Sequence, residues 1–377
     1  MPNELWVESP QLYFKHDQEC QFKEMLELDR HMVLLPVNLP QDVTFDNDAK
    51  IGSGTIKYRL TRWALLQLCK ITCPSMYGFV IDLAGMNRDD NSRREDYSFS
   101  EALEIFNRVI RRRFYTRLHG KVALVDMARK TIDGFVTSAY QWLPNCELYA
   151  RMKAAIEQTT DSVFLEASMV GRRMLLRYME KKPCFGFETE DGIEERFFSG
   201  YHFSNDEVGQ ASVRAANVLY RKFSKSASVI IVGDRSGFVN HVGPKFKSRF
   251  DQLIQGLLSH KYEPAKCMAS IRKLRETQLG LGSKNVNTEK KRMEEISSTL
   301  VRKCIPSDIA RSVVANTAYQ GSYDESPIES ILHRPKERTV YDLYNAMGRC
   351  AVSLPVHTRE LVERIAHTVF LGKVAFD

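Results

Sequence analysis

The feature that most constrains this sequence is a cluster of apolar, partly alternating segments in its middle. Between residues 162 and 237 lie MLLRYMEK, CFGFETED, ERFFSGYHFS and SVIIVGDRSG, which have the composition of β-strands. Asp191-Gly192, between the second and third, is a dipeptide typical of hairpins. Strands gathered in the middle of a chain, with helical segments on both sides, predict an α+β fold. Its core is a central, mainly antiparallel sheet flanked by helices.

Helical periodicity dominates outside this cluster. Thr61 is a candidate N-cap for a helix that ends before Pro74, and a second helix begins at Ser98 or Ser100 and ends near Leu118. Asn145 is placed to cap a third helix. Residues 245–318 are predominantly helical, and two further helices, TVYDLYNAMGRCAVSL and HTRELVERIAHTVF, follow near the end of the chain. The C-terminal third is therefore predicted to be mostly helical.

The pattern divides the chain into three regions. Residues 1–50 form an acidic N-terminal arm with ten acids and four bases. Residues 51–244 form the α+β core, and residues 245–377 form a mainly helical region that packs back on the core. The segment 279–290, LGLGSKNVNTEK, is rich in Gly, Ser and Asn, which predicts a flexible link within the helical region.

Basic charge is concentrated in two stretches, although the net charge of the chain is only +7. Residues 105–135 hold eight bases against two acids, and residues 261–303 hold eleven against five. Basic stripes of this kind indicate a polyanionic partner. The acidic arm is a candidate for screening them until that partner arrives.

The first basic stretch is a helix with arginines beside a tyrosine, EALEIFNRVIRRRFYTRLHGKVAL. Its apolar residues recur at three- and four-residue steps and predict a core-facing stripe. Arginine suits bidentate contact with phosphate, and an aromatic ring offers a stacking surface. The alternative is a solvated basic face that pairs with the acidic arm. The candidate nucleic-acid-binding residues here are Arg108, Arg111, Arg112, Arg113, Tyr115, Arg117 and Lys121.

A second candidate lies in VGRRMLLRYMEKK, where bases alternate with apolar residues. If this segment is a strand, Arg173 and Arg177 share one face. Arg172, Arg173 and Arg177 are then candidates for a basic sheet surface beside the arginine helix. The alternative is that they are edge-strand charges that prevent aggregation.

The stretch SNDEVG joins a strand-like segment to one that has a helical pattern and ends at Phe223. Ser204 and Glu207 match an S-x-x-E capping box, and Asp206 in the first turn suits the helix dipole. A metal site would use Asn205, Asp206 and Glu207, but three adjacent residues rarely converge on one ion. The cap is the favoured interpretation, with Gly209 leaving room for close packing.

Several other classes of protein are disfavoured. No run of 18 apolar residues exists and the N-terminus lacks the pattern of a secretory signal, so we expect a cytoplasmic protein without membrane spans. The eight cysteines form no C-x-x-C pair and are interpreted as structural thiols. Phosphate-loop, dinucleotide, nucleophile-elbow and zinc motifs are absent. We therefore assign no catalytic residue, no metal ligand and no cofactor.

Four blocks together resemble a known family. They are RLTRWALLQLCKITCPSMYGFVIDL, GFVTSAYQWLPNCELYARM, GYHFSNDEVGQASVRAANVLYRKF and TVYDLYNAMGRCAVSLPVHTRELVERIA. In this order they are similar to the phage- and plasmid-borne family catalogued as domain of unknown function 932. Its motifs fall here on Asn205, Asp206, Glu207 and Gly209, and on Asn345 and Arg349. The chain departs from the family at KFSKSASVI, where members have a Cys-x-Asn-Gly turn. The resemblance implies a phage or mobile-element origin, in a bacterial host cytoplasm, and carries no established chemistry.

Three functions remain open at this point. The first is a nucleic-acid-binding protein of phage or mobile-element DNA metabolism that binds or anneals single strands, of DNA or else RNA. Phage single-strand annealing proteins offer an architectural analogy and imply a homo-oligomer. The second is a metal-dependent nuclease or nucleotidyl-transfer enzyme that uses Asp206 and Glu207. The third is a structural or partner-binding phage protein. The first is preferred because it uses the clustered arginines.

Overall fold

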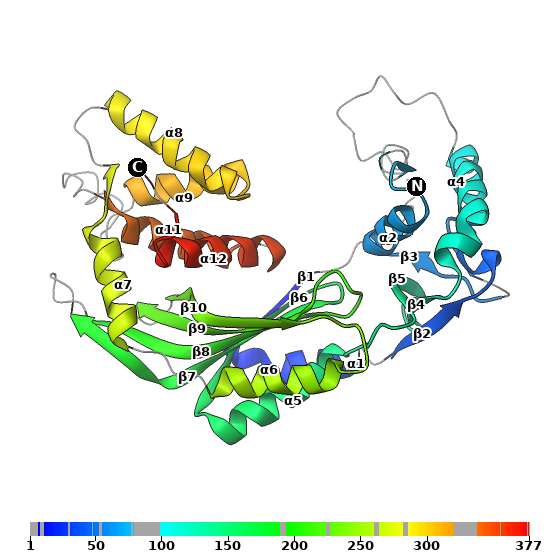
Figure 1. Ribbon diagram of the computed structural model, residues 1–377, viewed down its shortest axis with the longest axis horizontal. Helices are drawn as coiled ribbons and strands as arrows, with labels where there is room; N and C mark the ends of the chain where they lie inside the picture. Colours follow the sequence, from blue (N-terminus) through cyan, green and yellow to red (C-terminus); the bar gives the residue numbers. More distant parts are fainter. Residues whose placement is uncertain are drawn as a thin grey trace.

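The computed structural model of this 377-residue chain describes residues 7, 11–28, 31–46, 48–52, 55–76, 78, 99–188, 194–223, 227–259, 264–281, 286–319, 338–354, 356–374 and 376. The fold is α+β, as the pattern predicts. A large antiparallel sheet lies between an N-terminal lobe and a mostly helical C-terminal lobe (Figure 1).

The central sheet has six strands in the order β1-β6-β7-β8-β9-β10, and every neighbouring pair is antiparallel. Its strands are β1 (Gln11–Lys15), β6 (Ser162–Val170), β7 (Arg173–Glu188), β8 (Glu194–Asp206), β9 (Val213–Phe223) and β10 (Ala227–Val239). The segments MLLRYMEK and CFGFETED, predicted as two strands, are one continuous strand, β7. Its pairing with β8 is irregular between Met179 and Phe185, around the predicted joint at Lys182-Pro183.

The prediction of a helix from the SNDE joint to Phe223 is wrong, because this segment contains β9. β9 pairs with β8 on one side and with β10 on the other. Residues 217–221 are all buried, so a period of two is not visible there. A short, fully buried run cannot be assigned to strand or helix by periodicity, and here the two neighbouring strands override the helix propensity of Ala and Leu.

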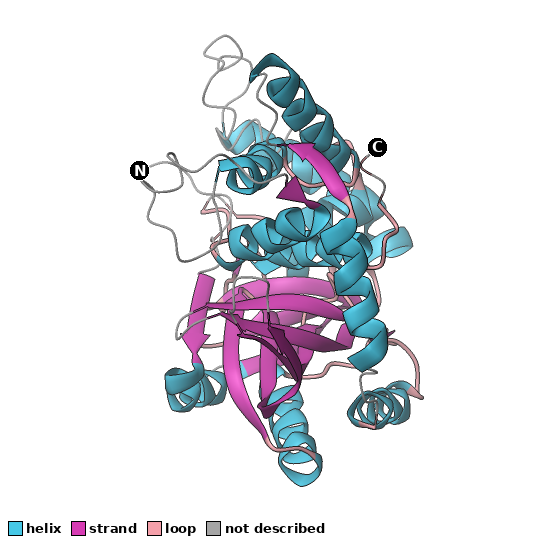
Figure 2. Cartoon of the chain, turned by 90° about the vertical axis from the view of Figure 1, so that its left-hand side faces the viewer, coloured by secondary structure: helices cyan, strands magenta, loops and turns pink. Residues whose placement is uncertain are grey.

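One face of the sheet is covered by α1 (Glu19–Leu28), α5 (Asn145–Thr159) and α6 (Phe246–Leu258), whose apolar side chains share a core with Tyr201, Phe203 and Ala215. The opposite face lies against α12 (Val356–Phe370), which contacts β6 and β10. Figure 2 shows most of the strands as one layer with helices above and below it.

The N-terminal lobe is built on a smaller sheet of order β2-β4-β5-β3. Its elements are β2 (Met32–Val37), the 3-10 turn η3 (Pro40–Val43), β3 (Arg59–Leu60), α2 (Arg62–Thr72), α4 (Phe99–Arg113), the π-helical turn η5 (Phe114–Leu118), β4 (Lys121–Asp126) and β5 (Thr131–Thr137). Thr61 caps α2 as predicted, since its hydroxyl accepts from the N–H of Ala64. Asn145 is the first residue of α5, one position after the N-cap, Pro144.

Residues expected in an acidic arm are integrated into both sheets. β1 forms an edge of the central sheet through its pairing with β6, and β2 pairs with β4 in the N-terminal lobe. The helix α1 packs on α5 and on β6. The first fifty residues therefore connect the two sheets.

The C-terminal lobe is mostly helical and packs around the far end of the sheet, where Phe197 and Leu219 join its core. It contains α7 (Pro264–Glu276), β11 (Gln278–Leu281), α8 (Val286–Arg302), α9 (Ser307–Tyr319), β12 (Arg338–Thr339), α11 (Val340–Val352) and α12. The segment 279–290, expected to be a link, contains most of β11 and the start of α8. No helix among the described residues is long and apolar enough to cross a membrane.

Candidate nucleic-acid interface

The arginine-rich segment predicted from sequence forms α4 and η5 on the N-terminal lobe. The apolar stripe of this segment is buried in the lobe's core, which fixes the opposite side toward solvent. Leu103, Phe106, Ile110, Phe114 and Leu118 make up this stripe. The helix thus presents its arginines outward because its other side is anchored.

Five arginines, which we call the arginine row, are all exposed on this outward side: Arg108, Arg111, Arg112, Arg113 and Arg117. Arg108 forms an ion pair with Glu104 at 2.5 Å, one turn away and itself exposed. No carboxylate within the described ranges pairs with the other four. An exposed pair is worth little in water, so even Arg108 is available to another anion.

Aromatic rings stand within the arginine row. Tyr115 is 72% exposed, its ring meets Phe114 edge-on at 5.2 Å, and it lies 5.9 Å from the exposed ring of His119. Lys121, at the start of β4, is partly exposed. Cations next to an exposed ring can hold a phosphate while a base stacks on the ring.

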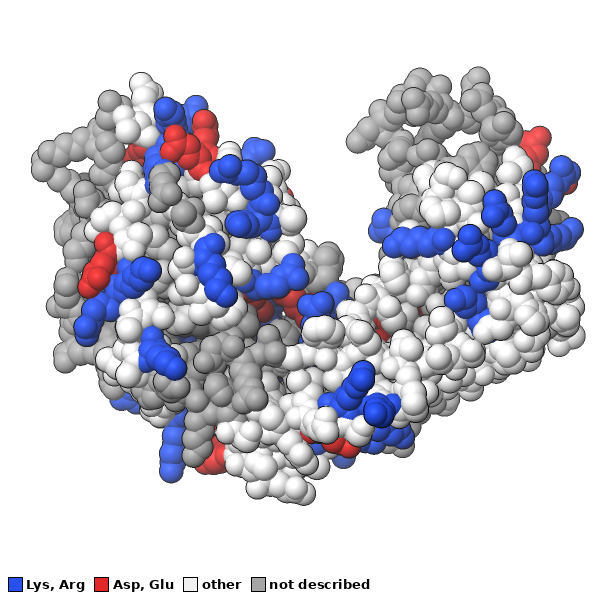
Figure 3. All heavy atoms as spheres, in the orientation of Figure 1, with Lys and Arg blue, Asp and Glu red and all other residues white. Residues whose placement is uncertain are grey.

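The arginine row belongs to a wider distribution of positive charge. Figure 3 shows a wide hollow between the two lobes, with Lys and Arg gathered on both lobes along it and few acidic residues visible there. The C-terminal lobe carries exposed bases on α8 and α9 and in the loop between them, namely Lys290, Lys291, Arg302, Lys303 and Arg311. Basic surfaces on both sides of a hollow raise the local concentration of a polyanion.

The second group of predicted arginines lies inside the molecule. Arg172 is buried where the N-terminal lobe meets the central sheet, and its guanidinium group bonds to Asp126 and Asp133, each at 2.5 Å. Both partners come from the N-terminal lobe, one on β4 and one on β5. Arg172 therefore joins the lobe to the sheet, and carboxylates of the same chain occupy its donors.

Arg173 and Arg177 do share one face of β7, as predicted, but that face is covered by α12. Arg177 is fully buried and pairs with Glu166 of β6 and with Glu363 of α12, the latter at 2.6 Å. Arg173 pairs with Glu360 of α12. The ion pairs of Arg173 and Arg177 hold α12 against the sheet. These two arginines therefore do not extend the exposed basic surface.

The cluster around Arg177 is a four-charge network. Arg359 of α12 contacts Glu166 at 2.6 Å and Glu363 at 3.0 Å, so two guanidinium groups alternate with two carboxylates. Burial alone would raise the pKa of Glu166, but the charges of Arg177 and Arg359 outweigh it and lower that pKa to about 2.

The SNDEVG corner does not begin a helix of its own. Ser204, Asn205 and Asp206 are the last residues of β8, so the predicted capping box at Ser204 is wrong. Glu207 instead accepts a hydrogen bond from the backbone N–H of Asn145, at the start of α5. It therefore caps a helix that lies far away in the sequence, and Gly209, with φ of 75°, turns the chain back toward β9.

Asn205 and Asp206 are buried beside this cap. The Asn205 amide donates to the backbone oxygen of Leu143 and to the side chain of Asn145, both at 2.9 Å. One Asp206 oxygen accepts from the N–H groups of Val208 and Gln210. Burial raises the pKa of Asp206 to about 6 although these two bonds oppose the rise.

The geometry of the corner fits a structural junction. Tyr140 donates to the backbone oxygens of Asp206 and Glu207, and Gln67 of α2 donates to that of Val208. Among the described residues, no three or more His, Cys, Asp or Glu side chains are arranged to hold a metal ion. The interactions of the corner hold α5, the sheet and the N-terminal lobe together.

Asn345 and Arg349, the two residues on which the late motif of the family resemblance falls, lie in α11 and have different environments. Asn345 accepts from Arg221 of β9 at 2.6 Å. The guanidinium groups of Arg221 and Arg275 lie 4.9 and 4.8 Å from the ring centre of Tyr341, which is one turn earlier in α11. Asn345 thus holds α11 against the sheet.

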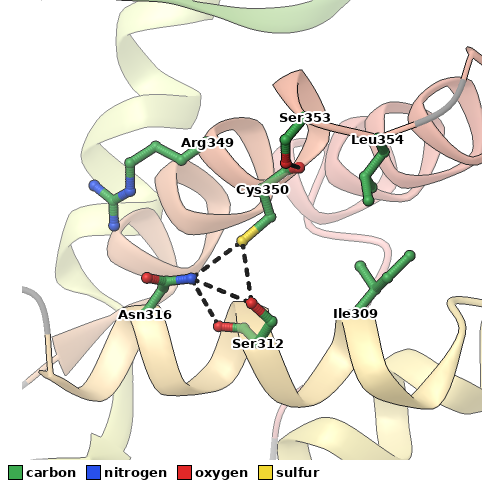
Figure 4. A pocket seen from close by; sticks show the side chains of 7 residues that line it. All are labelled: Ile309, Ser312, Asn316, Arg349, Cys350, Ser353 and Leu354. Atoms are coloured by element: carbon green, nitrogen blue, oxygen red, sulfur yellow. Dashed lines mark hydrogen bonds between the residues drawn. The ribbon is translucent and has the colours of Figure 1, made fainter.

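Arg349 lines a cavity of about 350 Å³ between α9 and α11. Asn316 donates to the backbone oxygen of Ser312 at 2.9 Å and contacts the Cys350 sulfur at 3.3 Å (Figure 4). The lining also includes Ile309, Ser312, Ser353 and Leu354. Among the residues that the structure describes, the lining contains no carboxylate or imidazole that would serve as a general base for the thiol.

The sequence interpretation missed the carboxylates that bind the buried arginines, namely Asp126, Asp133, Glu166, Glu360 and Glu363. A signal was present in part, because a charged residue such as Glu166 within an apolar strand is expected to be paired. The strand or helix that supplies the partner depends on how distant segments pack together. The sequence pattern did not predict that packing.

Compared with models of protein families, with curated proteins and with solved structures, the chain matches none of them.

Proposed function

We propose that the protein binds nucleic acid in single-stranded form through the arginine row of α4 and η5. The observation that carries the proposal is the exposure of the arginine row together with the aromatic ring beside it. Four of its five arginines are exposed and lack a carboxylate partner among the residues described, while the exposed ring of Tyr115 stands among them.

The residue types favour a phosphate backbone over a general anionic surface. Arginine presents a planar fork of donors that matches phosphate oxygens, whereas lysine would serve solubility equally well. Tyr115 and His119 add rings on which unpaired bases can stack, and a base within a duplex cannot reach them. The C-terminal lobe also carries exposed bases along the hollow, and basic residues on both lobes favour a polymer over a small anion as the ligand.

The biological setting is part of the proposal and rests on other grounds. An origin in a phage or mobile element rests on the family resemblance alone. Assembly as a homo-oligomer rests on the analogy to annealing proteins, and so does a role in annealing. DNA and RNA share the chemistry that the arginine row recognises, so both polymers belong in the test.

The test is binding of labelled oligonucleotides, measured by fluorescence anisotropy from about 50 to 200 mM salt. The variant replaces Arg111, Arg112 and Arg113 by Ala. We expect its affinity for a single strand to fall on the order of 10-fold to 100-fold at low salt. Its salt slope should fall by about 2, since each lost phosphate contact removes about 0.7.

A charge-matched control is available on α6. Lys245, Lys247 and Arg249 are exposed next to or on a helix that covers the other face of the central sheet. Their replacement by Ala removes the same charge and should change affinity less than 3-fold. Equal losses of affinity in both triple variants would mean that binding depends on overall charge and not on the arginine row. No binding by the wild type at about 50 mM salt would contradict the proposal.

A further inference from the structure

An exposed aromatic ring lies on the central sheet where the flanking helices leave it uncovered. Phe238 of β10 is 66% exposed, although its strand neighbour Val239 is buried under α6. Arg214 of β9 is directly opposite Phe238 in the antiparallel pairing. Side chains in such a pair point to the same face, with their Cβ atoms about 5 Å apart.

Strand alternation identifies the face on which the two residues lie. Val213 and Val239 point toward α6, so Arg214 and Phe238 point the opposite way. That opposite face is the one on which Arg177 meets Glu363 of α12. Phe238 and Arg214 are therefore on the α12 side of the sheet.

These two residues lie at the end of the sheet nearest the N-terminal lobe. Arg214 pairs with Ser204, two residues before Asp206, and Val208 accepts from Gln67 of α2. The ring and its neighbouring cation thus lie on the α12 side of the central sheet, at its end next to the N-terminal lobe, and we call this part of the sheet the sheet floor. Arg214 is exposed, and no carboxylate in the described segments pairs with it.

We propose that Phe238 and Arg214 form a second contact site for single-stranded nucleic acid on the sheet, with a base stacked on the ring and its phosphate held by the guanidinium group. This rests on the proposed function and adds a site to it. An exposed ring beside an exposed cation on a sheet surface combines the two interactions by which single strands are held.

The two sites define a path for the polymer. The arginine row binds the strand on the N-terminal lobe, and the sheet floor binds it again between the lobes. A duplex buries its base faces in the stack, so it can use the arginine row but not the ring of Phe238. The sheet site therefore selects for unpaired bases.

The experiment compares three substitutions at one position, with an oligothymidylate, an oligouridylate and a duplex as probes. Phe238→Ala should weaken single-strand binding about 5-fold to 100-fold, as expected for the loss of one stacked base. Phe238→Trp should keep wild-type affinity, and Phe238→Leu should resemble Phe238→Ala. Duplex affinity should change less than 2-fold in all three, and circular dichroism checks that the fold is retained.

A second readout follows stacking directly. A strand containing 2-aminopurine should lose fluorescence on binding to the wild type and to Phe238→Trp, and lose less with Phe238→Ala. Wild-type affinity and quenching in Phe238→Ala, together with weakened binding in the Arg111/Arg112/Arg113 variant, would overturn the sheet site and leave the arginine row standing. Wild-type affinity in Phe238→Leu would show that binding does not need stacking on an aromatic ring, and it would also overturn the sheet site.

Discussion

Arginines are mixed with apolar residues both in α4 and η5 and in β7, but the two groups of arginines have opposite surroundings. Arg112 is exposed and has no carboxylate partner in the described structure, whereas Arg177 is fully buried between Glu166 and Glu363. One set keeps its donors available to a ligand, and the other has them occupied by its own chain. Density of positive charge in a sequence therefore does not by itself locate a binding surface.

The physical reason is the cost of desolvation. A guanidinium group taken out of water must regain its hydrogen bonds and its counter-charge inside the protein, so each buried arginine here comes with carboxylates from other elements. An exposed arginine has no such requirement. The difference can be tested by making equivalent substitutions in both regions.

The largest effect is expected from Arg177→Ala. This change leaves Glu166 and Glu363 buried with Arg359 as their remaining guanidinium partner, and we expect the free energy of unfolding to fall by about 3 kcal/mol. Urea denaturation measures it. Arg108→Ala, which breaks the exposed pair with Glu104, should cost less than about 0.5 kcal/mol. Similar losses in both variants would remove the distinction between the two regions.

A pH-dependent effect of about 3 kcal/mol is expected at the buried corner. The pKa of Asp206 is raised from 3.8 to about 6, so the folded state holds this proton more tightly than the unfolded chain does. Its contribution to stability is full below pH 3.8 and is lost as the pH rises through 6. Asp206→Asn should therefore be more stable than the wild type at pH 8 and equal to it near pH 4.

Glu166 should show the opposite dependence. Its pKa is lowered from 4.5 to about 2, so its contribution is present above pH 4.5 and is lost as the pH falls toward 2. Denaturation at a series of pH values separates the two groups. Asp251→Asn, at an exposed position on α6, is the control and should shift stability by less than about 0.5 kcal/mol at every pH. A difference for Asp206→Asn that is constant with pH would contradict the assignment.

A smaller effect is expected at the cap of α5. Glu207→Ala removes the acceptor for the Asn145 N–H and should destabilise the protein by about 1 to 2 kcal/mol. Glu207→Gln keeps an acceptor oxygen and should cost about half as much. Hydrogen exchange at the first turn of α5 reports the local effect, and unchanged exchange in Glu207→Ala would show that the cap is not needed.

The smallest effect on stability is expected at Arg112. Arg112→Ala should change the free energy of unfolding by less than about 0.5 kcal/mol. It should nevertheless lower the salt slope of single-strand binding by about 0.7. A marked loss of stability would mean that the arginine row, like Arg177, is part of the internal packing.

The corner at SNDEVG shows how far the sequence could be interpreted. The pattern predicted a capping box, Ser204 with Glu207, at the start of a helix that follows a strand. The strand is found and the capping box is wrong, because Glu207 caps α5, which precedes β8 by many residues. Capping boxes are defined by local spacing, so a cap supplied from another part of the chain carries no local signal.

The sequence by itself determined the α+β class, the exposed arginine row and the two helices near the end of the chain, because these follow from local periodicity. Only the tertiary structure decided that residues 213–223 form a strand, since that depends on the two strands beside it. It also decided which arginines are buried. Burial and pairing arise from contacts between distant segments, such as Arg177 with Glu363, and local sequence does not specify those contacts.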